Sequence, residues 1–271
     1  MSATARRISE LRAEGRPALI GYLPVGFPTV DGSLRAARAL VEAGADILEI
    51  GVPYSDPVMD GSTIQAAAVR ALDGGVRLKD LFRVVEGVAD LGAPALVMTY
   101  FNPVLRYGVE RFAADLASAG GAGLITPDLV PEEASEWISA ADAHGLDKVF
   151  LVAPSSTGAR LASTAAASRG FVYAASTMGV TGERATVGPR AAELVARTRA
   201  AGAENVCVGL GVSRAEQAAE VGAYADGVIV GSAFVMPLLE ASSEDEGIAA
   251  MTAVARSIAG GVRAARAGGA A

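Results

Sequence analysis

Short apolar runs alternate along the chain with segments of helical periodicity. The runs are bounded by glycine, proline or polar residues, which is typical of parallel strands buried on both faces. Between them, apolar side chains recur at helical spacing, as at Leu34, Ala37 and Val41. Strands are predicted near Ala18–Val25, Ile47–Pro53, Ala95–Tyr100, Gly123–Pro127, Lys148–Ala153, Phe171–Ser176, Asn205–Gly211 and Gly227–Gly231. This alternation predicts a parallel α/β protein.

The number of repeats favours a closed barrel over an open sheet. The chain has 271 residues, and a (β/α)₈ barrel uses about 250 residues as one domain. No linker or change in composition divides the sequence, so we expect residues 1–271 to form one (β/α)₈ TIM barrel domain. Ala3–Glu14 is expected to add an N-terminal helix that caps the barrel bottom. Gly260–Ala271 has the composition of a flexible tail.

Composition and charge narrow the class of function. Hydrophobic residues make up 51% of the chain and charged residues 20%, which indicates a globular protein. The net charge of −7 has the wrong sign for binding nucleic acid or an anionic membrane surface. No apolar stretch is long enough to span a membrane, and Met1–Arg16 lacks the apolar core of a signal peptide, so we expect a cytoplasmic protein.

The rare residues exclude several kinds of catalytic site. A single histidine, His144, excludes a multi-histidine metal site, and a single cysteine, Cys207, excludes an intrachain disulfide and a cysteine-based zinc site. A Schiff-base aldolase needs a lysine near the active face. Lys79 is in a helical segment, and Lys148 begins a strand at the opposite end of the barrel. We therefore expect carboxylate acid–base chemistry, with no metal and no organic cofactor in this chain.

Barrel enzymes place their chemistry at the carboxyl ends of strands and in the loops that follow, and two carboxylates lie in the second predicted strand and in the loop after it. Glu49 lies inside an apolar run, where desolvation raises its pKa toward a range useful for acid–base catalysis. Its alternative role is a structural salt bridge to a neighbouring strand. Asp60 supplies a second carboxylate in a different environment, or it serves only as a turn or helix-cap residue before Gly61.

Glycines recur after the last three predicted strands. Barrels often bind phosphate in the loops after strands seven and eight, where glycine lets backbone amides approach an anion and a helix N-terminus attracts it. Taken singly, each glycine is explained equally well as an ordinary barrel corner. Together the glycines at Gly179–Gly182, Gly209–Ser213 and Gly231–Ala233 predict a phosphorylated small-molecule substrate, to which Ser232 could add a hydroxyl donor.

The segment LEIGVPYSDPVMDGSTIQAA at Leu48–Ala67 resembles the signature of the tryptophan synthase α chain family. Further motifs agree with the family in order and spacing: YLPVGFP at Tyr22–Pro28, MTYFNPV at Met98–Val104, LITPDLVPEE at Leu124–Glu133, YAASTMGVTG at Tyr173–Gly182, VGLGVS at Val208–Ser213 and GVIVGSAFV at Gly227–Val235. The resemblance implies a (β/α)₈ barrel that cleaves indole-3-glycerol phosphate to indole and glyceraldehyde 3-phosphate by a retro-aldol reaction.

The resemblance also implies a role for each matching residue. Glu49 would protonate indole C3 and accept the proton of the glycerol hydroxyl beside the breaking bond. Asp60 would bind the indole N–H and stabilise the positive charge that develops on the ring. Thr181 would meet Asp60 when two loops, residues 53–62 and 177–188, close over the site. The substrate pocket would be lined by Tyr22, Tyr100, Ile125 and Tyr173, and the phosphate would be bound by the amides of Gly182, Gly211, Gly231 and Ser232.

The family works with a β chain that carries pyridoxal phosphate, so the resemblance implies an α₂β₂ complex with the cofactor in the partner. The contact surface would include Pro53, Asp56, Pro57, Asn102 and Pro103. Ser62 and Met59 depart from the usual proline and alanine, which bears on loop closure more than on chemistry.

Three alternatives to this interpretation stay open. The first is a stand-alone lyase that releases free indole. The second is an allosteric subunit with weak catalysis of its own, although the intact Glu49 and Asp60 argue against it. The third is an unrelated barrel that acts on a sugar phosphate, and it leaves the Leu48–Ala67 motif unexplained.

Overall fold

The strands of the computed structural model, which describes residues 1–175, 189–209 and 211–265, form a sheet in which every ladder is parallel. Their order is β5-β4-β3-β2-β1-β9-β8-β7-β6. The strands are β1 (Ala18–Pro24), β2 (Ile47–Gly51), β3 (Ala95–Met98), β4 (Gly123–Ile125), β5 (Asp147–Val149), β6 (Leu151–Val152), β7 (Val172–Ala175), β8 (Val206–Gly209) and β9 (Gly227–Val230).

The first and last strands in this order, β5 and β6, are consecutive in the sequence. Only Phe150 separates β5, which pairs with β4, from β6, which pairs with β7. The Phe150 carbonyl accepts the Tyr173 amide at 3.0 Å, so backbone pairing continues across the division. The sheet therefore closes on itself, which confirms the predicted barrel. The predicted strand Lys148–Ala153 forms two pieces because its pairing partner changes at this point.

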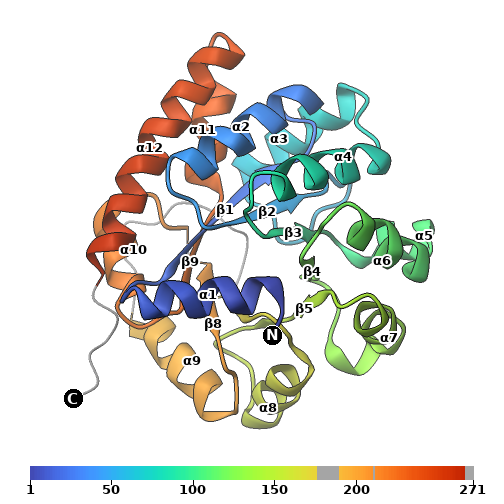
Figure 1. The fold of residues 1–271 in the computed structure, drawn as a ribbon, viewed down its shortest axis with the longest axis vertical. Coiled ribbons are helices and arrows are strands. Elements are labelled where there is room, and N and C mark those ends of the chain that lie inside the picture. The colour runs from blue at the N-terminus through green and yellow to red at the C-terminus, as the bar shows by residue number, and fades with distance from the viewer. Residues whose placement is uncertain (176–188, 210, 266–271) are drawn as a thin grey trace.

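Helices surround the barrel, as Figure 1 shows. The apolar core has two parts, one between helices and strands and one inside the barrel, where Ile20, Ile47, Leu96 and Cys207 meet. The helices are α1 (Ala3–Ala13), α2 (Val30–Glu42), α3 (Ser62–Asp73), α4 (Leu78–Ala89), α5 (Phe101–Tyr107), α6 (Val109–Ser118), η1 (Pro131–Glu133), α7 (Ser135–Ala143), α8 (Gly158–Ala167), α9 (Pro189–Ala200), α10 (Ala215–Gly222), α11 (Ser232–Glu240) and α12 (Glu244–Ala264).

The predicted N-terminal helix is confirmed as α1, which crosses the end of the barrel (Figure 1). Its side chains Ile8 and Leu11 are buried in the inner apolar cluster. Arg7 pairs with Asp46 at 2.9 Å, which fastens the helix to the loop before β2. The amino ends of the strands are thereby closed, and the carboxyl ends remain for chemistry.

The C-terminal region differs from its prediction. Residues 260–264, expected to begin a flexible tail, continue helix α12, and residues 266–271 lie outside the described part of the chain. The small residues serve close packing, because an ideal Cβ on Gly261 would lie 2.0 Å from the Ala215 carbonyl oxygen. Neither α12 nor any other helix of the described residues is long and apolar enough to span a membrane.

Candidate active site

Glu49 lies in the middle of β2, in register with Tyr22 of β1 and Leu96 of β3. It is 1% exposed, and its Oε2 atom has no hydrogen-bond partner among the described residues. Among the described residues Glu49 forms no salt bridge, so its alternative role as half of a structural ion pair is not supported. Burial of the carboxyl group raises the pKa of Glu49 to about 8. At pH 7 the group is a neutral acid with a proton to give.

Asp60 lies in the loop that connects β2 to α3 and is half-buried. The N-cap of α3 is Gly61, which has no side chain to offer the helix, so the carboxylate of Asp60 is not used as a helix cap. The Asp60 backbone carbonyl supports the helix start by accepting a hydrogen bond from Gln65 Nε2 at 2.8 Å. Burial raises the pKa of Asp60, and a hydrogen bond from Tyr100 opposes that rise.

Tyr100 follows the carboxyl end of β3, and its side chain reaches this loop. Its hydroxyl oxygen accepts the backbone N–H groups of Val58 at 2.9 Å and of Met59 at 2.8 Å. The same oxygen lies 3.5 Å from Asp60 Oδ1. The Tyr100 ring packs on Tyr54, with 5.1 Å between ring centroids. Tyr100, predicted only to line the substrate pocket, therefore also binds the backbone of the loop between β2 and α3.

Two further tyrosines extend the site across the barrel mouth. The pKa of Tyr22, on β1, is raised well above its ordinary value by burial and then by the charges of Asp60 and Glu49. The pKa of Tyr173, on β7, is raised by burial and then by Glu49. Glu49 acts on both phenols and Asp60 acts on Tyr22, so Tyr22 lies near both carboxylates and Tyr173 lies near Glu49.

Each of these tyrosines lies over a glycine that sequence reasoning missed. An ideal Cβ on Gly51 would be 2.1 Å from the hydroxyl oxygen of Tyr22, and one on Gly209 would be 2.3 Å from that of Tyr173. In both cases the glycine lies two residues beyond the residue that pairs with the tyrosine. A strand-ending glycine at this diagonal position is the signal that would have identified both.

The predicted pocket residue Ile125 ends β4 and is fully buried in the inner apolar cluster, against which Tyr173 packs. It contributes an apolar floor to this end of the barrel. Thr181 and Gly182, also predicted as site residues, lie outside the described residues.

The candidate phosphate-binding residues lie after β8 and β9. Gly211 has a positive φ of 67°, and Gly231 is the N-cap of α11. Ser232 begins that helix and is 8% exposed. In the described part of the chain, the first two helix amides, those of Ser232 and Ala233, donate to no backbone carbonyl. Such a helix start offers donors and a partial positive charge to an anion.

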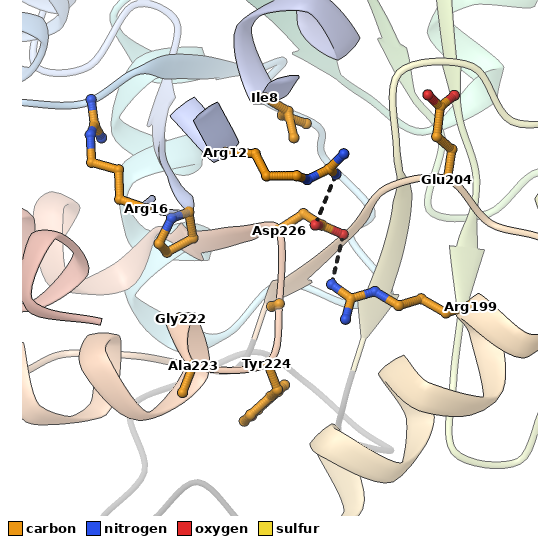
Figure 2. Close-up of a pocket in the computed structure, with 11 residues that line it drawn as sticks. Ile8, Arg12, Arg16, Arg199, Glu204, Gly222, Ala223, Tyr224 and Asp226 are labelled. Atoms are coloured by element: carbon orange, nitrogen blue, oxygen red, sulfur yellow. Dashed lines mark hydrogen bonds and ion pairs between the residues drawn. The ribbon is translucent and has the colours of Figure 1, made fainter. Parts of the chain in front are cut away.

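The opposite end of the barrel holds a cavity of about 360 Å³ that is remote from these residues. Figure 2 shows Arg12 of α1 and Arg199 of α9 both directed at Asp226, with nitrogen-to-oxygen distances of 3.0 and 2.9 Å. These arginines join helices to the loop before β9, which is a structural use. Among residues 1–175, 189–209 and 211–265, no three His, Cys, Asp or Glu side chains gather as a possible metal site.

Comparison with known proteins is consistent over nearly the whole chain. The sequence profile of the family described as tryptophan synthase alpha chain matches residues 8–263. The chain is 57% identical to the tryptophan synthase alpha chain of Thermobifida fusca over 268 residues, which cover 98% of this chain and 99% of the relative. It is 60% identical to that of Mycobacterium marinum over 252 residues, which cover 93% and 91% of the two chains.

Solved structures agree with the sequence matches. A chain of tryptophan synthase from Mycobacterium tuberculosis superposes with a TM-score of 0.91 at 56% identity, covering 97% of this chain and 98% of the other. A chain of the tryptophan synthase complex from Pyrococcus furiosus superposes with a TM-score of 0.83 at 32% identity, covering 90% and 98%.

Proposed function

The chain belongs to the tryptophan synthase alpha chain family, and on that premise we propose that Glu49 and Asp60 carry its reaction. The reaction is the cleavage of indole-3-glycerol phosphate to indole and glyceraldehyde 3-phosphate, a carbon–carbon lyase reaction. The observation that supports the proposal best is the environment of Glu49 in the barrel interior. Its side chain is 1% exposed, its Oε2 atom has no hydrogen-bond partner among the described residues, and burial raises its pKa to about 8.

Glu49 acts first as an acid. Its neutral carboxyl group donates a proton to C3 of the indole ring, which leaves positive charge on the ring nitrogen. The carboxylate of Asp60 accepts a hydrogen bond from the ring N–H and stabilises that charge. Because Asp60 is half-buried, its charge is screened less than a fully exposed carboxylate would be.

Glu49 then acts as a base. Its carboxylate takes the proton of the hydroxyl on the carbon attached to C3, and that oxygen forms the carbonyl of glyceraldehyde 3-phosphate. The bond between this carbon and C3 breaks, and its electron pair restores the aromatic indole. One proton is given and one is taken, so Glu49 ends as it began.

The remaining predicted residues bind the substrate in this proposal. The phosphate is bound by the backbone amides of Gly182, Gly211, Gly231 and Ser232. Ser232 begins α11, and among the described residues its amide donates to no backbone carbonyl. The side chains that surround the indole ring are Tyr22, Tyr100, Ile125 and Tyr173, and Thr181 meets Asp60 on closure.

We propose that a tryptophan synthase β chain covers the face formed by the loop after β2 and by α5. This face contains Pro53, Asp56, Pro57, Asn102 and Pro103. Two large apolar side chains on the same segments, Val58 and Leu105, are 76% and 52% exposed, as expected of a surface that a partner covers. Pyridoxal phosphate would belong to the β chain of an α₂β₂ complex, and this chain would hold no cofactor. A cytoplasmic location follows from the same proposal.

The test measures indole released from indole-3-glycerol phosphate by the purified chain, alone and then with a β chain of tryptophan synthase. Weak release that rises strongly on mixing supports the α-subunit role. Fast release without any effect of the β chain would indicate a stand-alone lyase. Absence of indole in both cases, with folded protein, would overturn the proposed reaction.

A further inference from the structure

The hydroxyl of Tyr100 has its hydrogen-bonding capacity assigned by its neighbours. A phenol oxygen has two acceptor sites and one proton to donate. The N–H groups of Val58 and Met59 occupy both acceptor sites, at 2.9 and 2.8 Å. The proton must therefore point away from those two amides, and Asp60 Oδ1 is the acceptor on the remaining side, at 3.5 Å.

The ring that carries this hydroxyl is held by the barrel scaffold. Tyr100 is 6% exposed and is the N-cap of α5, two residues after the end of β3. The next amide, that of Phe101, donates to both carboxylate oxygens of Asp128 at 3.0 and 3.1 Å. By contrast, the loop between β2 and α3 contains no regular secondary structure. Tyr100 thus connects a rigid element to an irregular loop.

We propose that Tyr100 is a positioning residue that acts through Asp60: it fixes the backbone of residues 58 and 59 and directs its phenol proton at the carboxylate. The proposal rests on the proposed role of Asp60 and deepens it. The Tyr100 hydroxyl has two roles in this proposal: it determines the position of Asp60, and it stabilises the ionised form of the Asp60 carboxylate. The ionised form is the one that accepts the indole N–H.

The surroundings of Asp60 show what its titration depends on. Burial raises the pKa of Asp60, and the Tyr100 hydrogen bond lowers it. The titratable groups that act on this region are Tyr22 from β1, Glu49 from β2, and Asp128, which acts on the Tyr100 phenol. Removing the Tyr100 hydroxyl leaves the burial and removes the opposing effect, so the pKa of Asp60 must rise.

The test compares Tyr100→Phe with Tyr54→Phe, its partner in the stacked pair. Tyr54 gives the matched control because its hydroxyl accepts Asn102 Nδ2 at 3.2 Å, on the side of α5 and not at Asp60. We expect Tyr100→Phe to lower kcat for indole release by about tenfold, and to move the acid limb of the kcat/KM pH profile to higher pH. We expect Tyr54→Phe to leave that limb in place.

A double variant separates a role through Asp60 from a general effect on structure. If Tyr100 acts through Asp60, adding Tyr100→Phe to Asp60→Asn lowers kcat no further. An additive loss, or an acid limb that does not move, would overturn the positioning role. If Asp60→Asn alone leaves kcat unchanged, the proposed function of Asp60 fails instead. Carboxyl-carbon NMR of Asp60 in parent and Tyr100→Phe measures its pKa without turnover, and an unchanged pKa would also overturn the proposal.

Discussion

The hydroxyl oxygen of Tyr22 lies in the space that a side chain at position 51 would need, 2.1 Å from an ideal Cβ on Gly51. Tyr22 is on β1 and Gly51 is on the neighbouring strand β2, where Glu49, two residues before Gly51, is the register partner of Tyr22. The position of this phenol beside the buried acid is thus set by the absence of a side chain. Gly51 is a part of the site although it has no functional group of its own.

Gly51→Ala is therefore expected to impair catalysis by moving the Tyr22 ring. A displacement of the order of 1 Å at a substrate-positioning group lowers turnover by about tenfold or more. Steady-state indole release measures the effect. Gly158→Ala is the matched control, because an ideal Cβ at that position, the first residue of α8, meets nothing within 4 Å. Equal turnover in the two variants would contradict the fitted arrangement of Tyr22 over Gly51.

The buried acid also makes stability depend on pH. The pKa of Glu49 is about 8 in the folded protein and 4.5 in a solvated chain. Between these values the folded state keeps a proton that the unfolded state has lost, so the free energy of unfolding falls as pH rises. The Glu49→Gln variant does not titrate. The free energy of unfolding of Glu49→Gln, relative to that of the parent, should therefore increase by on the order of 4 kcal/mol from pH 5 to pH 8.

Urea unfolding of both proteins at pH 5, 6.5, 8 and about 9.5 measures this difference. The gap in unfolding free energy should widen with pH and should level off above pH 8. A constant gap across the series would show that Glu49 titrates normally and is not desolvated as the structure indicates.

Activity should fall on the alkaline side for the same reason. The reaction begins from protonated Glu49, so kcat/KM should decline tenfold per pH unit above about pH 8. Tyr22 and Tyr173 do not titrate in this range, because burial raises the pKa of each well above 10. The measurement is kcat/KM from pH 6 to 10, in buffers in which the chain stays folded. A flat profile to pH 10 would contradict the acid role.

Two adjacent glycines of α12 should respond to alanine with opposite signs. Gly260 is exposed and its ideal Cβ meets nothing within 4 Å, so Gly260→Ala should stabilise the helix by ~0.5–1 kcal/mol. Gly261 is buried against the Ala215 backbone, so Gly261→Ala should destabilise the protein by ~1–3 kcal/mol. Denaturant midpoints of the two variants test this. Equal shifts would show that α12 and α10 are not packed as closely as described.

Much of the fold can be predicted because parallel strands that are buried on both faces are short apolar runs in the sequence. Apolar runs predict the strands, and the position of Glu49 within one of them indicates a buried carboxyl group, although the sequence alone leaves open whether that group is an acid or half of a salt bridge. The N-terminal helix is equally readable, since Ile8 and Leu11 recur at helical spacing among charged residues.

The parts that escape prediction depend on contacts between residues distant in sequence. Tyr100 holds the amides of Val58 and Met59 across about forty residues of chain, and no local pattern records that contact. Glycine is ambiguous in the same way. From composition alone, Gly260 and Gly261 are predicted to belong to a flexible tail. The local sequence does not show that both are helical or that α10 packs against Gly261.

The central claim is that Glu49 moves the protons in the cleavage of indole-3-glycerol phosphate. The most direct test measures indole release by Glu49→Gln in the presence of a β chain, with substrate binding followed in parallel by calorimetry. The account predicts that substrate still binds, because the phosphate and indole contacts are intact, and that indole release is abolished. Near-normal turnover of Glu49→Gln with bound substrate would contradict the assignment.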